Sequence, residues 1–320
     1  MKIAITGGGG FIGRKLALRL AERERLHGQA ITGLLLADLA APAPVEAAFP
    51  VETVAADISS PAGAAAAIPP GTGVVYHLAA VVSGHAEADF EAGMAANFHG
   101  TLNVLERCRS LGTAPLVVYT SSIAVYGGEV PDPIEDWYLL NPQTSYGTQK
   151  AVGELLLNDY SRRGFIDGRG LRLPTISIRP GRPNRAASSF MSSIFREPLQ
   201  GREAVCPVGP DYAHWYLSPR RVIDNLIHSA GIDAADMGQN RCFALPGRTY
   251  TIGEMVEAMR AVAGDGPCNL IRWEDDPETR KIVVGWRARF NPRKALKLGF
   301  QRDESFADNI RYFLEDDLET

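Results

Sequence analysis

The sequence predicts an α/β fold: a doubly wound parallel sheet, followed by a smaller C-terminal substrate-binding lobe. Up to about residue 170, apolar strand-like runs alternate with helical patterns, as in βαβ units. The run at residues 2–6 leads into a glycine cluster, and the run at 116–122 ends in hydroxyl side chains. Beyond these runs prolines become frequent. We therefore place a dinucleotide-binding domain at 1–172, to which some later segments return, and the lobe mainly at 173–320.

The N-terminal strand and its glycines predict a phosphate-binding turn. Glycines 7, 10 and 13 separate a short buried strand from an apolar-periodic helix, in the pattern Gly-x-x-Gly-x-x-Gly. Gly7 allows the tight turn, Gly10 lets the backbone approach a pyrophosphate, and Gly13 lets the helix pack closely on the strand. The helix N-terminus offers N–H groups to the anion. The alternative is a glycine turn that binds nothing.

Acidic residues follow the next two strands. The run at 31–37 ends at Asp38, where a carboxylate hydrogen-bonds the ribose hydroxyls of a dinucleotide and repels a 2′-phosphate. This favours NAD over NADP, although Asp38 can also be a solvated loop residue. The run at 51–55 is followed by Asp57 and Ile58, a plausible rim for the adenine.

Three further segments complete this domain. An alanine-rich stretch at 61–70 predicts a short surface helix, to which we assign no function. The strand at 74–78 ends in Ala79 and Ala80, whose small side chains let a flat ring approach. The pattern from about Glu87 to Arg109 predicts one long helix.

Tyr146 and Lys150 are candidates for proton transfer. They stand four residues apart at the start of a helical stretch, so both side chains leave the same face. A neighbouring cation stabilises a phenolate and lowers the tyrosine pKa from about 10 toward neutrality. Ser122 ends a buried strand, where its hydroxyl can hydrogen-bond a substrate oxygen. Taken singly, the pair can be a coincidence on a surface helix, and the serine can be a cap.

Together these residues resemble the extended short-chain dehydrogenases/reductases, relatives of the sugar-nucleotide epimerases and dehydratases. The resemblance spans the whole chain and rests on these motifs: Thr6-Gly7-x-x-Gly10-x-x-Gly13, Asp57-Ile58, His77-Leu78-Ala79-Ala80, Asn97-x-x-Gly100-Thr101-x-Asn103-Val104-Leu105, Ser122 with Val125-Tyr126-Gly127, Tyr146-x-x-x-Lys150, and Arg179-Pro180.

The resemblance implies a Rossmann fold and a set of site residues. Tyr146 would be the acid/base, Ser122 would donate to the substrate oxygen, and Lys150 would bind the nicotinamide ribose and lower the Tyr146 pKa. The residues that would line or support the cofactor side are Gly7, Gly10, Phe11, Ile12, Gly13, Asp38, Asp57, Ile58, Leu78, Ala79, Ala80, Asn97, Tyr146, Lys150 and Pro180.

Departures from the family pattern narrow the reaction. Dehydratases of this family carry an Asp-Glu pair directly after the serine position, where this chain has Ile123 and Ala124, which cannot move protons. Many sugar-nucleotide enzymes place an asparagine three residues after Arg179, where this chain has Arg182. The planar guanidinium of Arg182 can donate two parallel hydrogen bonds to a carboxylate, although Arg182 can also be a surface arginine or one that binds a cofactor phosphate. The stretch 214–221 lacks the acids that such enzymes carry.

Segments 171–184, 186–190 and 196–199 are similar to a narrower group, the D-erythronate dehydrogenases. This similarity implies NAD-dependent oxidation of the 2-hydroxyl of a small sugar acid, with Ser122, Tyr146 and Arg182 contacting the substrate. A sugar-nucleotide 4-epimerase is the alternative enzyme, because it would use the same tyrosine and NAD. A non-catalytic dinucleotide sensor is a third possibility, against which the retained serine, tyrosine and lysine argue.

Composition limits the partners and the compartment. The 320 residues are 45% hydrophobic and 22% charged, with a net charge of −4, which argues against nucleic acid and anionic membranes. The four cysteines form no Cys-x-x-Cys pair and the six histidines show no metal-ligand spacing, so we expect reduced thiols and no metal. The first strand starts at Lys2, which leaves no room for a signal peptide. We therefore expect a cytoplasmic enzyme, and the resemblance suggests a homodimer.

Overall fold

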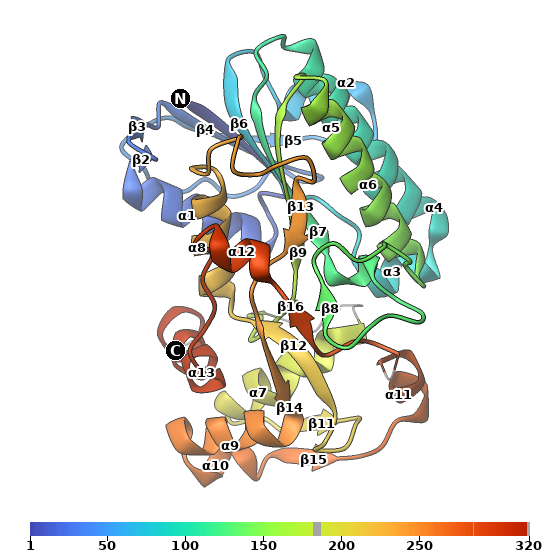
Figure 1. The fold of residues 1–320 in the computed structure, drawn as a ribbon. Coiled ribbons are helices and arrows are strands. Elements are labelled where there is room, and N and C mark those ends of the chain that lie inside the picture. Colours follow the sequence, from blue (N-terminus) through green and yellow to red (C-terminus); the bar gives the residue numbers. More distant parts are fainter. Residues whose placement is uncertain (182–186, 284, 319–320) are drawn as a thin grey trace.

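A seven-stranded parallel sheet forms the centre of the larger part of the molecule (Figure 1). The computed structural model describes residues 1–181, 187–283 and 285–318. The strand order is β13-β9-β7-β6-β1-β4-β5, which confirms the predicted doubly wound parallel fold. The strands are β1 (Lys2–Thr6), β4 (Gly33–Asp38), β5 (Val51–Ala55), β6 (Thr72–His77), β7 (Leu116–Ser122), β9 (Asp167–Leu173) and β13 (Cys242–Ala244).

The strand order reverses at β1. From β1 the chain first extends the sheet through β4 to β5, and then returns to the other side of β1 with β6, β7 and β9. In such sheets ligands bind in the crevice at the carboxyl ends of the strands, beside the reversal point. The topology therefore places a site where β1, β6 and β7 end.

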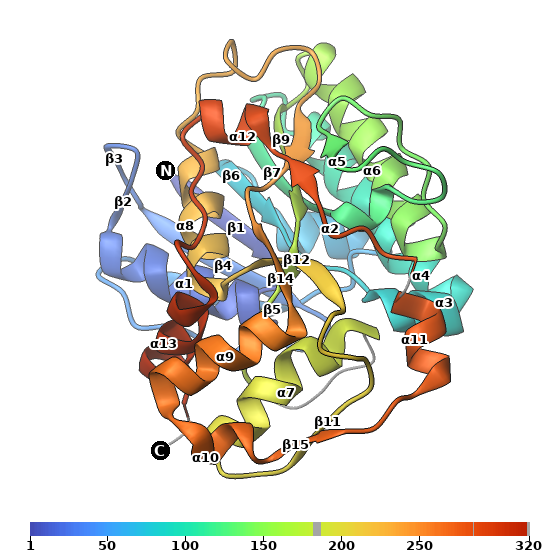
Figure 2. The ribbon, with the colours of Figure 1, turned by 60° about the horizontal axis from the view of Figure 1, so that its bottom comes forward.

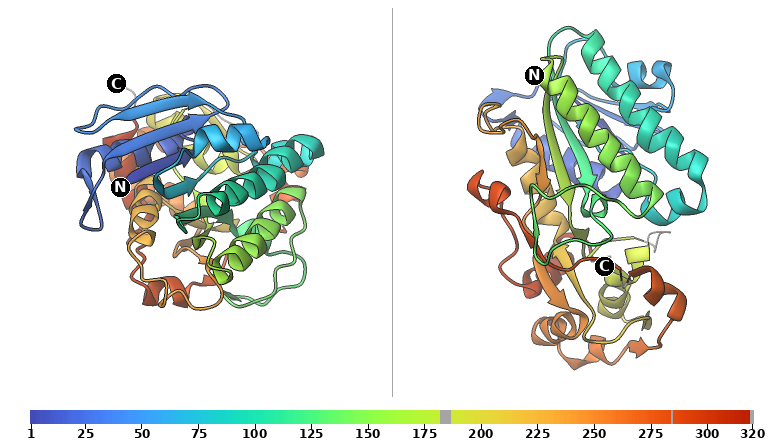
Figure 3. Two further views of the ribbon diagram at one scale, coloured as in Figure 1. Left: turned by 90° about the horizontal axis from the view of Figure 1, so that it is seen from above. Right: turned by 45° about the vertical axis from the view of Figure 1, so that its right-hand side comes forward.

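Helices cover both faces of the sheet (Figure 3). One face packs against α1 (Phe11–Arg23), α8 (Pro219–Ser229) and α12 (Arg293–Lys297), and the other against α2 (Pro61–Ala67), α5 (Gly100–Ser110) and α6 (Ser145–Arg162). Alternation along β1 directs the packing, because Ile3 and Ile5 enter the first cluster while Ala4 enters the second. Both faces of β1 are buried, as expected for a parallel sheet.

The predicted long helix from Glu87 to Arg109 is wrong in one respect, because the helix is interrupted. The structure has α3 (Ser83–Ala88), α4 (Phe90–Gly93), a π-helical turn (Met94–His99) and then α5. Asp89 adopts an extended backbone, and its side chain accepts a hydrogen bond of 3.0 Å from the Ala92 N–H. An aspartate that caps the following helix ends the preceding one, since its backbone leaves the helical region.

The remaining residues form a lobe beside the carboxyl ends of the strands (Figure 2). A three-stranded sheet has the order β10-β12-β14, and β11 pairs with β15. Phe195, Met255 and Ile310 belong to the lobe's own apolar core. The strands are β10 (Thr175–Ile176), β11 (Ala204–Cys206), β12 (Ala213–Leu217), β14 (Arg248–Thr251) and β15 (Ile271–Trp273), and the helices are α7 (Phe190–Leu199), α9 (Ile252–Ala263), α10 (Asp265–Cys268), α11 (Pro277–Val283) and α13 (Phe306–Asp316).

The start of α9 shows how the sequence sets a boundary in this lobe. The Thr251 side chain accepts from the Glu254 N–H, and the Glu254 carboxylate accepts from the Thr251 N–H, which forms a capping box. Short pairings complete the structure: β2 (Arg25–Leu26) with β3 (Gln29–Ala30), and β8 (Ile134–Glu135) with β16 (Phe290–Asn291).

The described part of the chain bears on disulfides, metal sites and membrane-spanning helices. All four cysteines are buried and free of disulfides. Among the described residues, no group of His, Cys, Asp and Glu side chains could hold a metal ion. Within the same residues, no helix combines the length and apolar character that crossing a membrane requires. The division of domains at residue 172 remains a prediction; β13, from residues 242–244, lies in the central sheet.

Candidate active site

The glycine turn after β1 is closely packed. Gly7 has a φ of +76°, and a Cβ there would lie 2.7 Å from the Ala79 nitrogen. A Cβ on Gly13 would lie 2.2 Å from the Gly7 carbonyl oxygen, so only glycine lets α1 start this close to β1. The Asp38 carboxylate accepts a hydrogen bond of 2.9 Å from the Gly9 N–H. The acid at the end of β4 is therefore held beside the turn.

A cavity of about 320 Å³ opens at the carboxyl ends of β1, β6, β7 and β9. The glycine turn lines one part of it, and the predicted catalytic side chains line another. Of the residues predicted from sequence, the lining includes Gly7, Gly10, Phe11, Ile12, Gly13, Leu78, Ala80, Ser122, Tyr146 and Lys150. Side chains are absent or small where a pyrophosphate would approach the α1 N-terminus, so the residues present fit a dinucleotide.

Asn97 lies behind the cavity wall rather than in it. Its carboxamide accepts 2.8 Å from the Val81 N–H and donates 3.0 Å to the Val81 carbonyl. It also donates 2.8 Å to the Gln149 side chain, next to Lys150 in sequence. Asn97 thus fixes the segment after β6 relative to α6, which is a supporting role.

The other predicted cofactor residues also surround the cavity rather than line it. Asp57 accepts 2.9 Å from the Ser59 N–H and so shapes the turn after β5. Ile58 is buried against Gly100, where a Cβ would lie 3.0 Å from the Ile58 side chain. Ala79 packs on Gly7, as described above. Pro180 is partly buried, and the structure gives it no further contact that bears on the site.

Tyr146 and Lys150 lie on the first turns of α6. Thr144 caps this helix by accepting 3.0 Å from the Gly147 N–H. The Lys150 ammonium donates 2.8 Å to the Thr120 carbonyl and lies 5.7 Å from the centre of the Tyr146 ring. The lysine side chain is 2% exposed. The predicted pair is therefore together, although the ammonium is directed at β7 rather than at the phenol.

Burial determines the ionisation of both groups. It raises the pKa of Tyr146 to about 12, with a hydrogen bond from Ser122 acting in the opposite direction. Burial lowers the pKa of Lys150 to about 7, which the nearby Glu154 carboxylate opposes. The predicted lowering of the Tyr146 pKa is thus wrong, because desolvation outweighs a lysine that hydrogen-bonds elsewhere.

A second cavity, of about 420 Å³, adjoins the first. Ser122 and Tyr146 line both cavities, so their hydroxyls lie at the junction. Residues from β10, β12, β16 and the segment before β16 line this second cavity, and they include aromatic and polar groups: Thr175, His214, Trp286, Arg287 and Phe290. A substrate in this second cavity would meet the cofactor cavity at the two hydroxyls.

His214 and Arg287 are site residues that the sequence analysis missed. The His214 Nε2 lies 2.9 Å from the Thr175 hydroxyl, while burial lowers the pKa of the imidazole to about 3 and keeps it neutral. Its Nδ1 is buried without a partner among the described residues. Arg287 donates 2.7 Å to the Gly128 carbonyl at the cavity wall. The stretch 214–221, which lacks the acids that sugar-nucleotide enzymes carry, was a sequence signal near His214, whereas no sequence pattern indicated Arg287.

Two arginines, Arg179 and Arg182, follow β10 near the predicted carboxylate site. Arg182 lies outside the described residues. Arg179 lines the first cavity and donates 2.8 Å to the Ser188 carbonyl. Burial, with a smaller effect of Arg196, lowers the pKa of Arg179 to about 10. Arg179 is thus held by the protein itself, in keeping with a structural role for the Arg-Pro turn.

Residues 3–215 match the family described as the NAD dependent epimerase/dehydratase family. The chain belongs to this family. The D-erythronate dehydrogenase of Cupriavidus necator is 50% identical over 320 residues, which cover 99% of this chain and 98% of that protein. The D-erythronate dehydrogenase of Haemophilus influenzae is 42% identical over 318 residues, covering 99% and 100%.

A solved structure has the same fold as this chain. The nucleoside-diphosphate-sugar epimerase from Agrobacterium tumefaciens superimposes with a TM-score of 0.95 and 46% identity, covering 99% of this chain and 94% of that chain. The resemblance to extended short-chain dehydrogenases/reductases is confirmed, and so is the narrower likeness to D-erythronate dehydrogenases. This family member is an NAD-dependent oxidoreductase, and its glycine turn and Asp38 fit that cofactor.

Proposed function

We propose that this chain oxidises the 2-hydroxyl of a small sugar acid, D-erythronate, to 2-dehydro-D-erythronate. The names of two relatives, 50% and 42% identical, support the substrate. The observation that carries the proposal is the position of Ser122 and Tyr146, which line both adjoining cavities. A hydroxyl held by these two residues faces the cofactor cavity, while the rest of the acid lies in the second cavity.

Ser122 orients the substrate oxygen. Its Oγ accepts 3.1 Å from the Ala124 N–H, which fixes the oxygen and leaves the hydroxyl hydrogen free to donate. A substrate hydroxyl can accept this hydrogen bond while donating its own proton toward the Tyr146 oxygen. Because the substrate hydroxyl is positioned before the reaction, the reacting groups need not meet by chance, and the entropic contribution to the activation barrier is lowered.

Tyr146 takes the proton of the 2-hydroxyl. NAD, which the glycine turn and Asp38 would hold, would supply the acceptor for the hydride of C2, and loss of the proton and the hydride would convert the alcohol to a ketone. The phenol must first be ionised, which burial opposes by raising its pKa to about 12. Lys150, when protonated, lies 5.7 Å from the Tyr146 ring and stabilises the phenolate.

Arginine and histidine side chains would hold the remainder of the acid. We assign the carboxylate to Arg182, whose guanidinium matches it in a bidentate manner. Arg287, which lines the second cavity, is the described arginine that competes for this role. The neutral His214, with its free Nδ1, suits a sugar hydroxyl, because an uncharged imidazole both donates and accepts hydrogen bonds.

A sugar-nucleotide 4-epimerase is the second candidate. The Agrobacterium structure that is 46% identical bears an epimerase name, which favours it. Such an enzyme would keep its NAD and return the hydride to the other face of the sugar. It would therefore release no net NADH.

One assay separates the two candidates. The purified protein is mixed with NAD and with each of a panel of four- to six-carbon sugar acids, and in parallel with UDP-sugars. We expect NADH formation with D-erythronate, loss of that signal in Tyr146→Phe, and no conversion of UDP-sugars. Interconversion of UDP-sugars without net NADH would contradict the dehydrogenase proposal.

We further propose that the enzyme works in the cytoplasm as a homodimer. The family resemblance supports the dimer, and the reduced cysteines suit a reducing compartment. Light scattering during size-exclusion chromatography measures the mass directly. A mass near the 34.6 kDa of one chain would contradict the dimer.

A further inference from the structure

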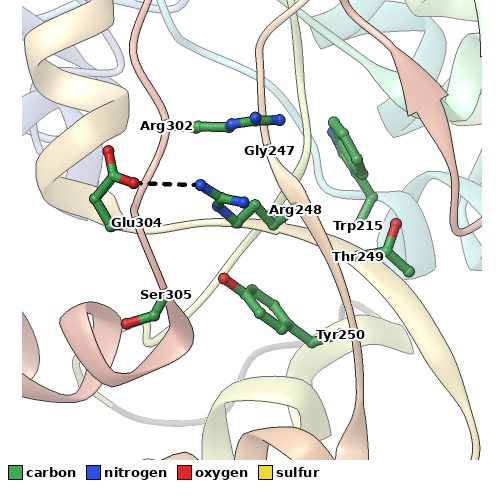
Figure 4. Close-up of a pocket in the computed structure, with 8 residues that line it drawn as sticks. All are labelled: Trp215, Gly247, Arg248, Thr249, Tyr250, Arg302, Glu304 and Ser305. Atoms are coloured by element: carbon green, nitrogen blue, oxygen red, sulfur yellow. Dashed lines mark hydrogen bonds and ion pairs between the residues drawn. The ribbon is translucent and has the colours of Figure 1, made fainter.

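A third cavity, of about 300 Å³, lies in the lobe between β14 and the segment 302–305 that precedes α13 (Figure 4). None of its lining residues is shared with the two cavities of the active site. The lining is polar and includes two arginines, a tryptophan, a tyrosine and two hydroxyl residues. Arg248, Arg302 and Tyr250 are the lining residues that could bind an anion.

The charge in this cavity is positive. The Arg302 guanidinium lines it, and within the described part of the chain no hydrogen bond or ion pair engages that side chain. Arg248 donates 2.7 Å to the Asp303 carbonyl and lies 3.4 Å from the Glu304 carboxylate (Figure 4). The Glu304 side chain is 86% exposed, so water screens it. Two cations therefore face one solvated anion.

One buried donor is left without a partner beside the arginines. The Tyr250 hydroxyl is buried and has no hydrogen-bond partner among the described residues. Arg248 and Tyr250 stand two residues apart on β14, so their side chains leave the same face of the strand. Trp215 pairs with Thr249 and therefore lies on the other face, against Phe290. Buried donors without partners are rare, and the Tyr250 hydroxyl marks a place for a ligand acceptor.

We propose that this cavity binds a small oxyanion, the carboxylate or phosphate group of a metabolite. Arg302 and Arg248 would neutralise the charge, and the Tyr250 hydroxyl would donate to an oxygen of the anion. Guanidinium forks match the oxygen spacing of both groups. A cation would find no carboxylate cage here, because the acid that lines the cavity is Glu304, at its exposed rim. The site is independent of the proposed dehydrogenase reaction.

Phosphate titration tests the site. Inorganic phosphate is titrated calorimetrically into the full-length protein saturated with NAD, so that the glycine turn is already occupied. We expect one binding event, which Arg302→Gln weakens at least tenfold, since hydrogen bonds to charged groups correspond to roughly 10–150-fold in binding. Tyr250→Phe should also weaken binding, while its melting temperature shows that it folds.

A matched control and a second probe complete the experiment. Arg220 belongs to the same part of the chain but is already paired with Glu315 and Asp316, so Arg220→Gln should bind phosphate like the wild type. A titration with acetate in place of phosphate distinguishes a carboxylate site from a phosphate site, because the anion that binds more tightly identifies the preferred group. Absence of phosphate and acetate binding by the wild type, or equal weakening by Arg302→Gln and Arg220→Gln, would overturn the proposal.

Discussion

At the residue scale, the proposed chemistry depends on two buried groups that both favour their neutral forms. Burial raises the pKa of Tyr146 to about 12 and lowers that of Lys150 to about 7. The general base of an oxidation must be ionised, and the burial of Tyr146 opposes this ionisation. Rising pH ionises Tyr146 but, above about pH 7, also removes the Lys150 proton that stabilises the phenolate, so the rate should rise toward neutrality and level off above it.

Replacing Tyr146 by phenylalanine removes only the hydroxyl. We expect Tyr146→Phe to lower kcat for sugar-acid oxidation by ~10²–10⁴, the usual contribution of a general base, and to abolish the rise with pH. NAD binding should change little, which a fluorescence titration of the cofactor checks. Near-full activity of this variant would show that another group takes the proton.

Asp38 should determine the choice of cofactor. Its carboxylate accepts from the Gly9 N–H and so is fixed beside the turn that would hold the cofactor's pyrophosphate. We expect Asp38→Ala to raise KM for NAD and to narrow the difference from NADP, because the ribose loses an acceptor and a 2′-phosphate loses a repelling charge. Steady-state kinetics with both cofactors decides this. A wild-type preference for NADP would contradict the assignment.

Arg182 should hold the substrate carboxylate. We expect Arg182→Met to raise KM for the acid by roughly 10–150-fold, the effect of a hydrogen bond to a charged group, and to leave KM for NAD nearly unchanged. Arg220 and Arg221 serve as controls, since both lie on α8 and pair with acids there or on α13. If Arg287→Met gives the selective loss and Arg182→Met does not, the described arginine of the second cavity binds the carboxylate.

At the element scale, a buried ion pair joins three elements behind the catalytic lysine. Arg172 of β9 donates 2.7 Å to the Glu154 carboxylate of α6, and the two side chains are 2% and 1% exposed. Ser121 of β7 donates 2.5 Å to the same carboxylate. Arg172 also hydrogen-bonds the Tyr126 hydroxyl, beside the second cavity. The pair therefore fixes α6, and with it Lys150, relative to the ends of β7 and β9.

Neutralising Glu154 leaves a buried guanidinium without its counter-ion. We expect Glu154→Gln to reduce the free energy of unfolding by about 3–5 kcal/mol, the cost of breaking a buried pair from one side. Asp159→Asn on the same helix is a matched control, because Asp159 pairs with Arg162 at the surface. Urea denaturation of both variants measures the difference. Equal, small losses would show that the buried pair contributes little.

Elements that end in a local signal could be predicted from sequence, and others could not. β1 stops at glycines and β7 stops at hydroxyls, and both strands were predicted near their observed ends. The break at Asp89 was missed because the apolar periodicity continues through it. His214 and Arg287 lie about 70 residues apart and meet only through tertiary packing, so no local pattern joins them.

At the scale of the whole molecule, two buried histidines tie folding to pH. His77 lies between the hydroxyls of Thr6 and Thr101 in the sheet domain, and His214 lies in the lobe. Burial lowers the pKa of each to about 3, from an unperturbed value near 6.5. Between these values the unfolded chain binds more protons than the folded one. Stability is therefore lost as the pH falls from about 6.5 toward 3.

Removing one of these histidines should flatten that dependence. We expect His77→Gln to lower stability at pH 7 but to reduce its loss between pH 6.5 and 5 by up to about 1.4 kcal/mol per pH unit, the value for one proton. His99→Gln, at an exposed position, should keep the wild-type slope. Urea titrations at a series of pH values measure both slopes. Parallel slopes for His77→Gln and the wild type would mean that other groups dominate acid unfolding.

The seventh strand of the sheet has a consequence for biosynthesis. β13 pairs with β9 but begins only at Cys242, some 70 residues after β9 ends. While the ribosome makes the intervening segment, the nascent chain holds an unpaired parallel edge at Leu171 and its neighbours. Exposed edges of this kind recruit other strands. Slow translation between β9 and β13 should therefore favour aggregation during synthesis, and protection by nascent-chain chaperones should matter most in that interval.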